Sequence, residues 1–116
     1  MEIPGYTLHG DYYLSDKIVF WKSWGRSIKM KEVITLPNGK KVIAHTLSKK
    51  ELETIPRKER KCDKWYWTST LNDDSNAWYV NYCGDFIFIN IKYSFDYGGA
   101  RLGFHKSEIK QLLDIE

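Results

Sequence analysis

The fold is decided by three consecutive segments: WYWTST at residues 65–70, AWYVNY at 77–82 and DFIFINIKY at 85–93. Aromatic and β-branched residues dominate these segments, and both kinds favour strands over helices. A polar loop at residues 72–76 separates the first segment from the second, and Cys83 and Gly84 separate the second from the third. The pattern predicts a strand, a loop and a hairpin, closed by a short strand at residues 100–104.

The third segment alternates between two faces of its predicted strand. One face carries Ile87, Ile89, Ile91 and Tyr93, and the other carries Phe86, Phe88, Asn90 and Lys92. We expect the isoleucine face to join the core and the phenylalanine face to stay partly open. Two interpretations of the phenylalanine rings remain open, because rings in such a place form either a second packing layer beneath a loop or a binding patch.

The chain ahead of these segments predicts a lead-in and a second hairpin. Residues 1–11 contain two turn signals, and the apolar run at residues 18–21 predicts a short buried strand. Residues 28–36 and 41–47 are expected to pair around a Pro-Asn-Gly turn, because Asn and Gly tolerate the positive φ that tight hairpin turns require.

Two short helices are expected. A serine and a glutamate form a capping-box pattern at residues 48–51, which predicts a helix at residues 48–55. The inward side chains of that helix would be Leu52 and Ile55. A proline ends the helix, and residues 56–64 are expected to form a charged loop. An amphipathic pattern at residues 107–113 predicts the second helix.

Length and composition bound the fold class. The chain has 116 residues, of which 42% are hydrophobic and 16% aromatic, so a single domain with one core is expected. Within residues 1–116 we expect N-terminal strands and a hairpin at 1–46, a central core at 47–104 and a C-terminal helix at 105–116. This mixture of strands and short helices is typical of the α+β class.

The sequence shows no signal peptide and no apolar run long enough to cross a membrane. We therefore expect a cytoplasmic protein with no membrane partner, or a component of a larger particle. Cys62 and Cys83 are the two cysteines, and free thiols are the expectation for a reducing compartment. The sequence leaves open whether they meet, and it leaves the oligomeric state open.

No catalytic or metal-binding motif stands out. His9, His45 and His105 are scattered, without the spacing of a metal site, so we expect no enzyme activity, no cofactor and no metal. The loop residues Asn72, Asp73, Asp74 and Asn76 could supply oxygen ligands to calcium. Neighbouring Asp and Asn residues more often shape a solvated turn, and we prefer that interpretation.

The basic segment offers a contact surface for an acidic partner. It begins with Lys49 and Lys50, and residues 57–61 add Arg57, Lys58, Arg60 and Lys61. A solvated helix end is the simpler interpretation, and binding of nucleic acid is the functional alternative. Aromatic rings interleaved with cations also suggest stacking on bases or sugars. The candidates for stacking are Trp21, Trp24, Arg26, Phe86, Phe88, Lys92, Tyr93 and Tyr97.

Four short segments stand out by their order along the chain: LSKKELE at residues 47–53, YWTST at 66–70, AWYVNYCG at 77–84 and GARL at 99–102. They resemble motifs of the formylglycine-generating-enzyme / C-type-lectin-like superfamily. Their order is similar to that in small bacterial and phage domains of this superfamily. The chain departs from the pattern at Ser48, where the family has proline, and at Ala100, where it has a larger residue.

The resemblance implies a C-type-lectin-like core, with a twisted antiparallel sheet and one or two short helices beside it. It also implies structural roles for Trp67, Trp78 and Arg101, the last through buried hydrogen bonds to surrounding loops. Arginine suits that role because its five donors can satisfy several carbonyl groups at once.

Together these observations predict a non-enzymatic binding module of phage or mobile-element type. Its partner would be a protein. The chain would bind this partner either as an inhibitor of a host defence protein or as a receptor-binding component. Nucleic acid bound by residues 57–61 and a carbohydrate ligand are the alternatives. The predicted partner-binding residues are Asn72, Asp73, Asp74, Asn76, Phe86, Phe88, Asn90, Lys92 and Tyr97.

Overall fold

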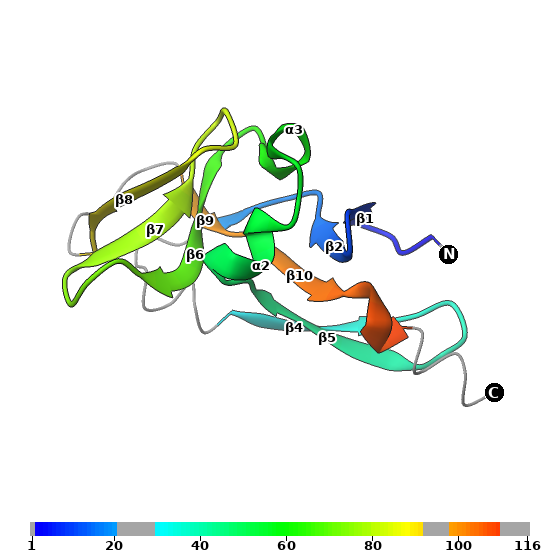
Figure 1. Ribbon diagram of the computed structural model, residues 1–116. Coiled ribbons are helices and arrows are strands. Elements are labelled where there is room, and N and C mark those ends of the chain that lie inside the picture. The colour runs from blue at the N-terminus through cyan, green and yellow to red at the C-terminus, as the bar shows by residue number, and fades with distance from the viewer. Residues whose placement is uncertain (1, 21–29, 92–97, 110–116) are drawn as a thin grey trace.

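The computed structural model describes residues 2–20, 30–91 and 98–109, and it places their strands in two five-stranded sheets (Figure 1). Sheet A has the order β1 (Tyr6–His9), β2 (Tyr12–Ser15), β10 (Leu102–His105), β5 (Lys41–Thr46) and β4 (Lys31–Thr35). Sheet B has the order β3 (Val19–Phe20), β9 (Gly98–Ala100), β6 (Trp65–Leu71), β7 (Asn76–Val80) and β8 (Phe86–Asn90). With the helices α2 (Lys49–Glu53) and α3 (Arg57–Arg60), the fold is α+β.

The expectation of one antiparallel sheet is wrong in two respects. There are two sheets, and β6 pairs with β9 in parallel while the other described pairs are antiparallel. The single closing strand predicted at residues 100–104 is also broken. Its first part, β9, belongs to sheet B, and β10 belongs to sheet A. The chain crosses between the sheets at Arg101, the one residue between β9 and β10.

A buried cluster joins α2 to both sheets. It contains Leu14 from β2, Leu47, Leu52 and Ile55 from the helical segment, and Tyr66 and Val80 from sheet B. Burial of each Leu or Ile side chain is worth about 1.5–3 kcal/mol, so this cluster is a main source of stability. The predicted capping box is confirmed: Ser48 Oγ accepts from Glu51 N at 3.1 Å, and Glu51 Oε1 accepts from Ser48 N at 2.9 Å.

Three local predictions about the first 64 residues are wrong. Residues 1–11 include strand β1, which pairs with β2 across a turn where Gly10 has φ +61°. Residues 56–64 are not all loop, because Pro56 precedes helix α3. Proline is common at the start of a helix, because a backbone N–H there would have no acceptor within the helix. The apolar run at 18–21 does form a strand, β3, but Val19 is 37% exposed, so the expected burial is wrong at that residue.

The second hairpin forms as predicted, with β4 antiparallel to β5. Gly39 has φ +85°, and its N–H donates to the carbonyl of Leu36. The first residues of the predicted strand, 28–29, lie outside the described part. Of the predicted C-terminal helix, residues 106–109 are helical and 110–113 lie outside the described part.

Strand β8 is the outermost strand of sheet B, and this position corrects the expected core. Ile87 is 38% exposed and Phe88 is 50% exposed, so neither face of the strand is fully buried. Ile89 and Ile91 pack partly against Trp67 and its neighbours. A strand at the edge lacks a neighbour on one side, which explains why its central side chains stay accessible.

Candidate binding face and open sheet edge

Three rings share the side of sheet B that faces α2, and we call Trp78, Phe86 and Phe88 the aromatic face. Trp78 and Phe88 are directly paired across β7 and β8, with ring centroids 5.0 Å apart and planes at 75°. Such an edge-to-face contact adds about 0.5–1.5 kcal/mol beyond burial. The contact holds the half-exposed Phe88 ring in a fixed orientation, which suits a binding surface.

Cations flank the aromatic face. Lys49 Nζ lies 4.8 Å from the Trp78 ring centroid and 5.1 Å from that of Phe86, and it also pairs with Glu53. The Arg60 guanidinium lies 4.5 Å from the Phe86 ring centroid. Its Nε donates to the carbonyl of Gly84 at 3.0 Å, and no ion pair joins Arg60 to a carboxylate within the described residues. The face therefore combines apolar rings with positive charge.

Among the described residues, the backbone of β8 has no strand on its outer side. In the β7–β8 hairpin Asn81 N donates to Asp85 O at 3.0 Å, and beyond the strand Ile91 N donates to Ser75 O at 2.8 Å. Hydrogen-bonded pairs alternate along an antiparallel ladder, so Ile87 and Ile89 direct their N–H and C=O groups toward β7. The N–H and C=O groups of Phe86 and Phe88 therefore point away from the sheet.

The polar loop at residues 72–75 is organised by one carboxylate. Asp73 Oδ1 accepts from the N–H of Ser75 at 2.8 Å and of Asn76 at 2.9 Å. The Asn76 side-chain amide also donates to both Asp73 oxygens at 2.9 Å. The Ser75 N–H, followed by the Asn76 amide, lowers the pKa of Asp73. Asp73 thus shapes the turn, whereas Asn72 and Asp74 are exposed to solvent.

The basic segment holds the β7–β8 turn against α3. Arg57 Nε lies 2.8 Å from an Asp85 oxygen and 3.1 Å from the Cys83 carbonyl. Gly84 has φ +85°, and a Cβ there would approach the Arg57 carbonyl to 2.3 Å. Of the four basic residues at positions 57–61, Arg57 and Arg60 therefore each donate to the turn through Nε.

The remaining basic residues surround a small hollow beside the same turn. It has a volume of about 340 Å³ and is lined by Arg57, Lys58, Lys61, Tyr82 and Cys83. Lys58 and Lys61 are exposed and make no ion pair among the described residues. The hollow gives this end of β8 a positive potential, which favours an acidic neighbour.

Arg101 lies where the two sheets and α3 meet, and it is only 5% exposed. Its Nε donates to the Ser15 carbonyl at 2.8 Å, and its Nη1 donates to the Arg60 carbonyl at 3.0 Å and the Tyr66 hydroxyl at 3.4 Å. Burial raises the pKa of Tyr66, and the Arg101 charge opposes that rise. These contacts tie β2, α3 and β6 together. Trp67 is also buried, at 1% exposure.

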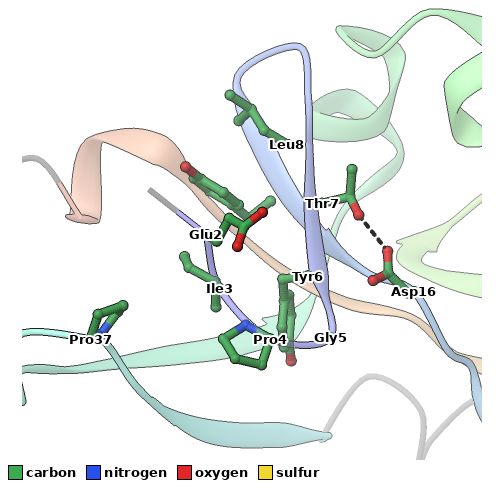
Figure 2. Close-up of a pocket in the computed structure, with 10 residues that line it drawn as sticks. Glu2, Ile3, Pro4, Gly5, Tyr6, Thr7, Leu8, Asp16 and Pro37 are labelled. Atoms are coloured by element: carbon green, nitrogen blue, oxygen red, sulfur yellow. Dashed lines mark hydrogen bonds between the residues drawn. The ribbon is translucent and has the colours of Figure 1, made fainter.

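A second hollow, of about 590 Å³, lies at the N-terminal segment and β1. Figure 2 shows its lining, which includes Ile3, Pro4, Tyr6 and Leu8, with the Thr7 hydroxyl donating to Asp16. None of the predicted partner-binding residues contributes to its lining. The hollow therefore stands apart from the aromatic face.

The structure brings some predicted binding residues together and separates others. Phe86, Phe88 and Asn90 share β8, and the 72–75 loop lies at the far end of that strand from α3, as Figure 1 shows. Lys92 and Tyr97 lie outside the described part, as do the stacking candidates Trp21, Trp24, Arg26 and Tyr93. The sequence indicated Lys49 only as part of the basic segment, and its place beside the rings was missed because it depends on how α2 packs on sheet B.

The described ranges contain neither a metal-binding cluster nor a membrane-spanning helix. Residues 2–20, 30–91 and 98–109 contain no group of three His, Cys, Asp or Glu side chains placed to hold a metal ion. Across the same ranges, no helix has the length and apolar character to cross a membrane. Cys62 is partly buried and Cys83 is exposed, and both are free thiols.

No protein-family model matches this chain, and neither a curated protein nor a solved structure gives a significant match. The resemblance to the C-type-lectin-like superfamily stays a prediction. The aromatic face and the outer edge of β8 are therefore the features of the described residues that bear on function.

Proposed function

We propose that this protein is a non-enzymatic module that binds a protein partner through the aromatic face. The observation that carries the proposal is the exposure of Phe88, which is 50% exposed although Trp78 holds its ring in place. Rigid aromatic rings bury large areas on binding and lose little conformational entropy, which is why they dominate protein interfaces.

The flanking charges indicate the chemistry of the partner. Arg60 has no carboxylate partner among the described residues, and it lies over the ring of Phe86. Lys49 shares its charge between Glu53 and two rings. A partner segment with an apolar side chain for Phe88 and a carboxylate for Arg60 would complement both features. We propose such an acidic and apolar segment as the ligand of the face.

The proposal extends to fold family and setting. We propose a C-type-lectin-like core of the phage or mobile-element type, acting as an inhibitor of a host defence protein or as a receptor-binding component. Support comes from the four ordered motifs at residues 47–102 and from an aromatic face suited to protein contact. Binding by a small cytoplasmic module with no cofactor would need only this surface.

The test is partner capture from a bacterial lysate with a matched pair of variants. Phe88→Ala removes the half-exposed ring of β8, and Val33→Ala removes an apolar side chain that is 61% exposed on β4. We expect Phe88→Ala to reduce capture of a salt-resistant protein at least about tenfold, as hot-spot residues do. Val33→Ala should capture as much as the unaltered chain.

Equal capture by the two variants would overturn the proposal, because the aromatic face would then not be the contact. If nucleic acid is captured and elutes with salt, the function is instead nucleic-acid binding through Lys58 and Lys61. Thermal melting of both variants serves as the control for folding.

A further inference from the structure

We propose that the open edge of β8 pairs with β8 of a second copy of this chain. The two strands would run antiparallel, so that two five-stranded sheets join into one sheet of a symmetric dimer. This inference goes beyond the proposed function, since it concerns the edge of the strand, whereas partner binding concerns its face. Three features of the described residues support it.

The first feature is the edge itself. Phe86 and Phe88 direct their N–H and C=O groups outward, and no hydrogen bond to these groups exists among the described residues outside the β7–β8 ladder. Phe86–Asn90 carries no charged residue and no proline, the usual means by which a protein keeps another strand from adding. A row of open backbone groups beside apolar side chains is a template for a further strand.

The second feature is the symmetry of the strand. The segment Ile87-Phe88-Ile89 at the centre of the strand reads the same in both directions. With Phe88 on the two-fold axis, Phe88 would exchange hydrogen bonds with Phe88 of the second copy, and Ile87 would face Ile89. Ile87, 38% exposed, and Phe88, 50% exposed, would then gain apolar neighbours on opposite faces.

The third feature is charge. Residues 65–91 contain Asp73, Asp74 and Asp85 but no Lys or Arg. Asp73 and Asp74 lie at the end of sheet B where Ser75 meets Ile91, whereas the hollow with Lys58 and Lys61 lies at the opposite end of β8. Antiparallel pairing therefore brings the acidic loop of each copy to the basic end of the other.

The pairing closes on itself. A two-fold interface uses the same strand of both copies, so it stops at the dimer and does not propagate into a fibre. In the joined sheet the two aromatic faces become neighbours on one side, which doubles the surface offered to a partner. A dimer is therefore compatible with the proposed function but does not depend on it.

Analytical ultracentrifugation of the whole chain over a concentration series tests the pairing. We expect a monomer–dimer equilibrium that Phe88→Lys shifts to monomer, because a lysine at the centre would face a second lysine. Val33→Lys is the matched change on β4, an edge strand of sheet A, and it should leave the equilibrium unaltered. A chain that is monomeric at every concentration, or a dimer that survives Phe88→Lys, would overturn the inference.

Charge reversal gives a second test that leaves the aromatic face intact. Asp74→Lys alone and Lys58→Glu with Lys61→Glu should each weaken dimerisation about tenfold at low salt. An equal mixture of these two variants should recover dimers, since every contact between unlike chains is again attractive. If the mixture does not recover, the charged ends do not meet and the antiparallel pairing is wrong. Partner capture by the same variants reports separately on the proposed function.

Discussion

Two outermost strands of this molecule have the same length and opposite characters. Both β4 (Lys31–Thr35) and β8 (Phe86–Asn90) have five residues and end a five-stranded sheet. β4 begins with Lys31 and Glu32, whereas β8 has no charged residue. Charge on an edge strand keeps other chains from adding to it. The difference teaches that β4 is built to remain in water and β8 to be covered.

The turns at the tips of the β4–β5 and β7–β8 hairpins also differ. Gly39 and Gly84 both have φ +85°, but a Cβ at Gly39 meets no atom within 4 Å. A Cβ at Gly84 would collide with the backbone of Arg57. The β4–β5 turn stands free in solvent, whereas the β7–β8 turn is clamped to α3 and fixes one end of β8.

The largest expected effect on stability comes from Arg101, which joins the two sheets that carry β4 and β8. Arg101→Met removes donors to Ser15, Arg60 and Tyr66, and we expect the free energy of unfolding to fall by about 3 kcal/mol. Urea unfolding followed by tryptophan fluorescence measures the change. Arg57→Met is the control, since its exposed ion pair should contribute less than about 1 kcal/mol. Equal losses would show that Arg101 does not join the sheets.

The two turns give the next effect. We expect Gly84→Ala to cost about 2–4 kcal/mol, from positive φ and from the collision with Arg57, and Gly39→Ala only about 1–2 kcal/mol from φ. Melting both variants beside the unaltered chain measures the difference. A larger loss of stability for Gly39→Ala than for Gly84→Ala would contradict the difference between the two turns.

A smaller effect should appear at high pH on the side of β4. Tyr6 donates to Glu32 of β4 at 3.0 Å, and burial, followed by this hydrogen bond, raises the pKa of Tyr6 above its ordinary value of 10.0. Because the raised pKa belongs to the folded state, its stabilisation is present below pH 10.0 and is lost as the pH rises beyond it. The denaturation midpoint of the unaltered chain should fall as the pH rises beyond that value, and the fall should be smaller for Tyr6→Phe.

The smallest effect should appear at low pH near the far end of β8. Donation from Ser75 and Asn76 lowers the pKa of Asp73 below 3.8 in the folded state. The stabilisation is therefore present above pH 3.8 and is lost as the pH falls through the lowered value. Acid titration followed by circular dichroism should show a weaker pH dependence for Asp73→Asn. An unchanged dependence would mean that Asp73 does not organise the loop.

Local signals in the sequence predicted local structure well. The capping box at Ser48 and the Pro-Asn-Gly turn at residues 37–39 both formed, because each depends on residues within a few positions of one another. Strands β6 and β7, and the alternation of β8, were also predictable from aromatic and β-branched content.

What failed depends on contacts far apart in the chain. Nothing within residues 100–104 indicates that the strand divides at Arg101 between two sheets, because its partners Ser15 and Tyr66 are distant in sequence. The exposure of Ile87 follows from the position of β8 at the edge, and strand order is likewise a non-local property. The lack of charge in β8 was the one local signal that could have revealed the open edge.

Amide hydrogen exchange tests the contrast between the two edges most directly. On β4, Leu36 N donates to Lys40 O, so the alternation of the ladder directs the Val33 N–H outward, like that of Phe88 on β8. We predict that the Phe88 amide exchanges more slowly as the protein concentration rises, because a second β8 covers it. The Val33 amide should exchange fast at every concentration. Equally fast exchange at Phe88 and Val33 in concentrated samples would contradict the account.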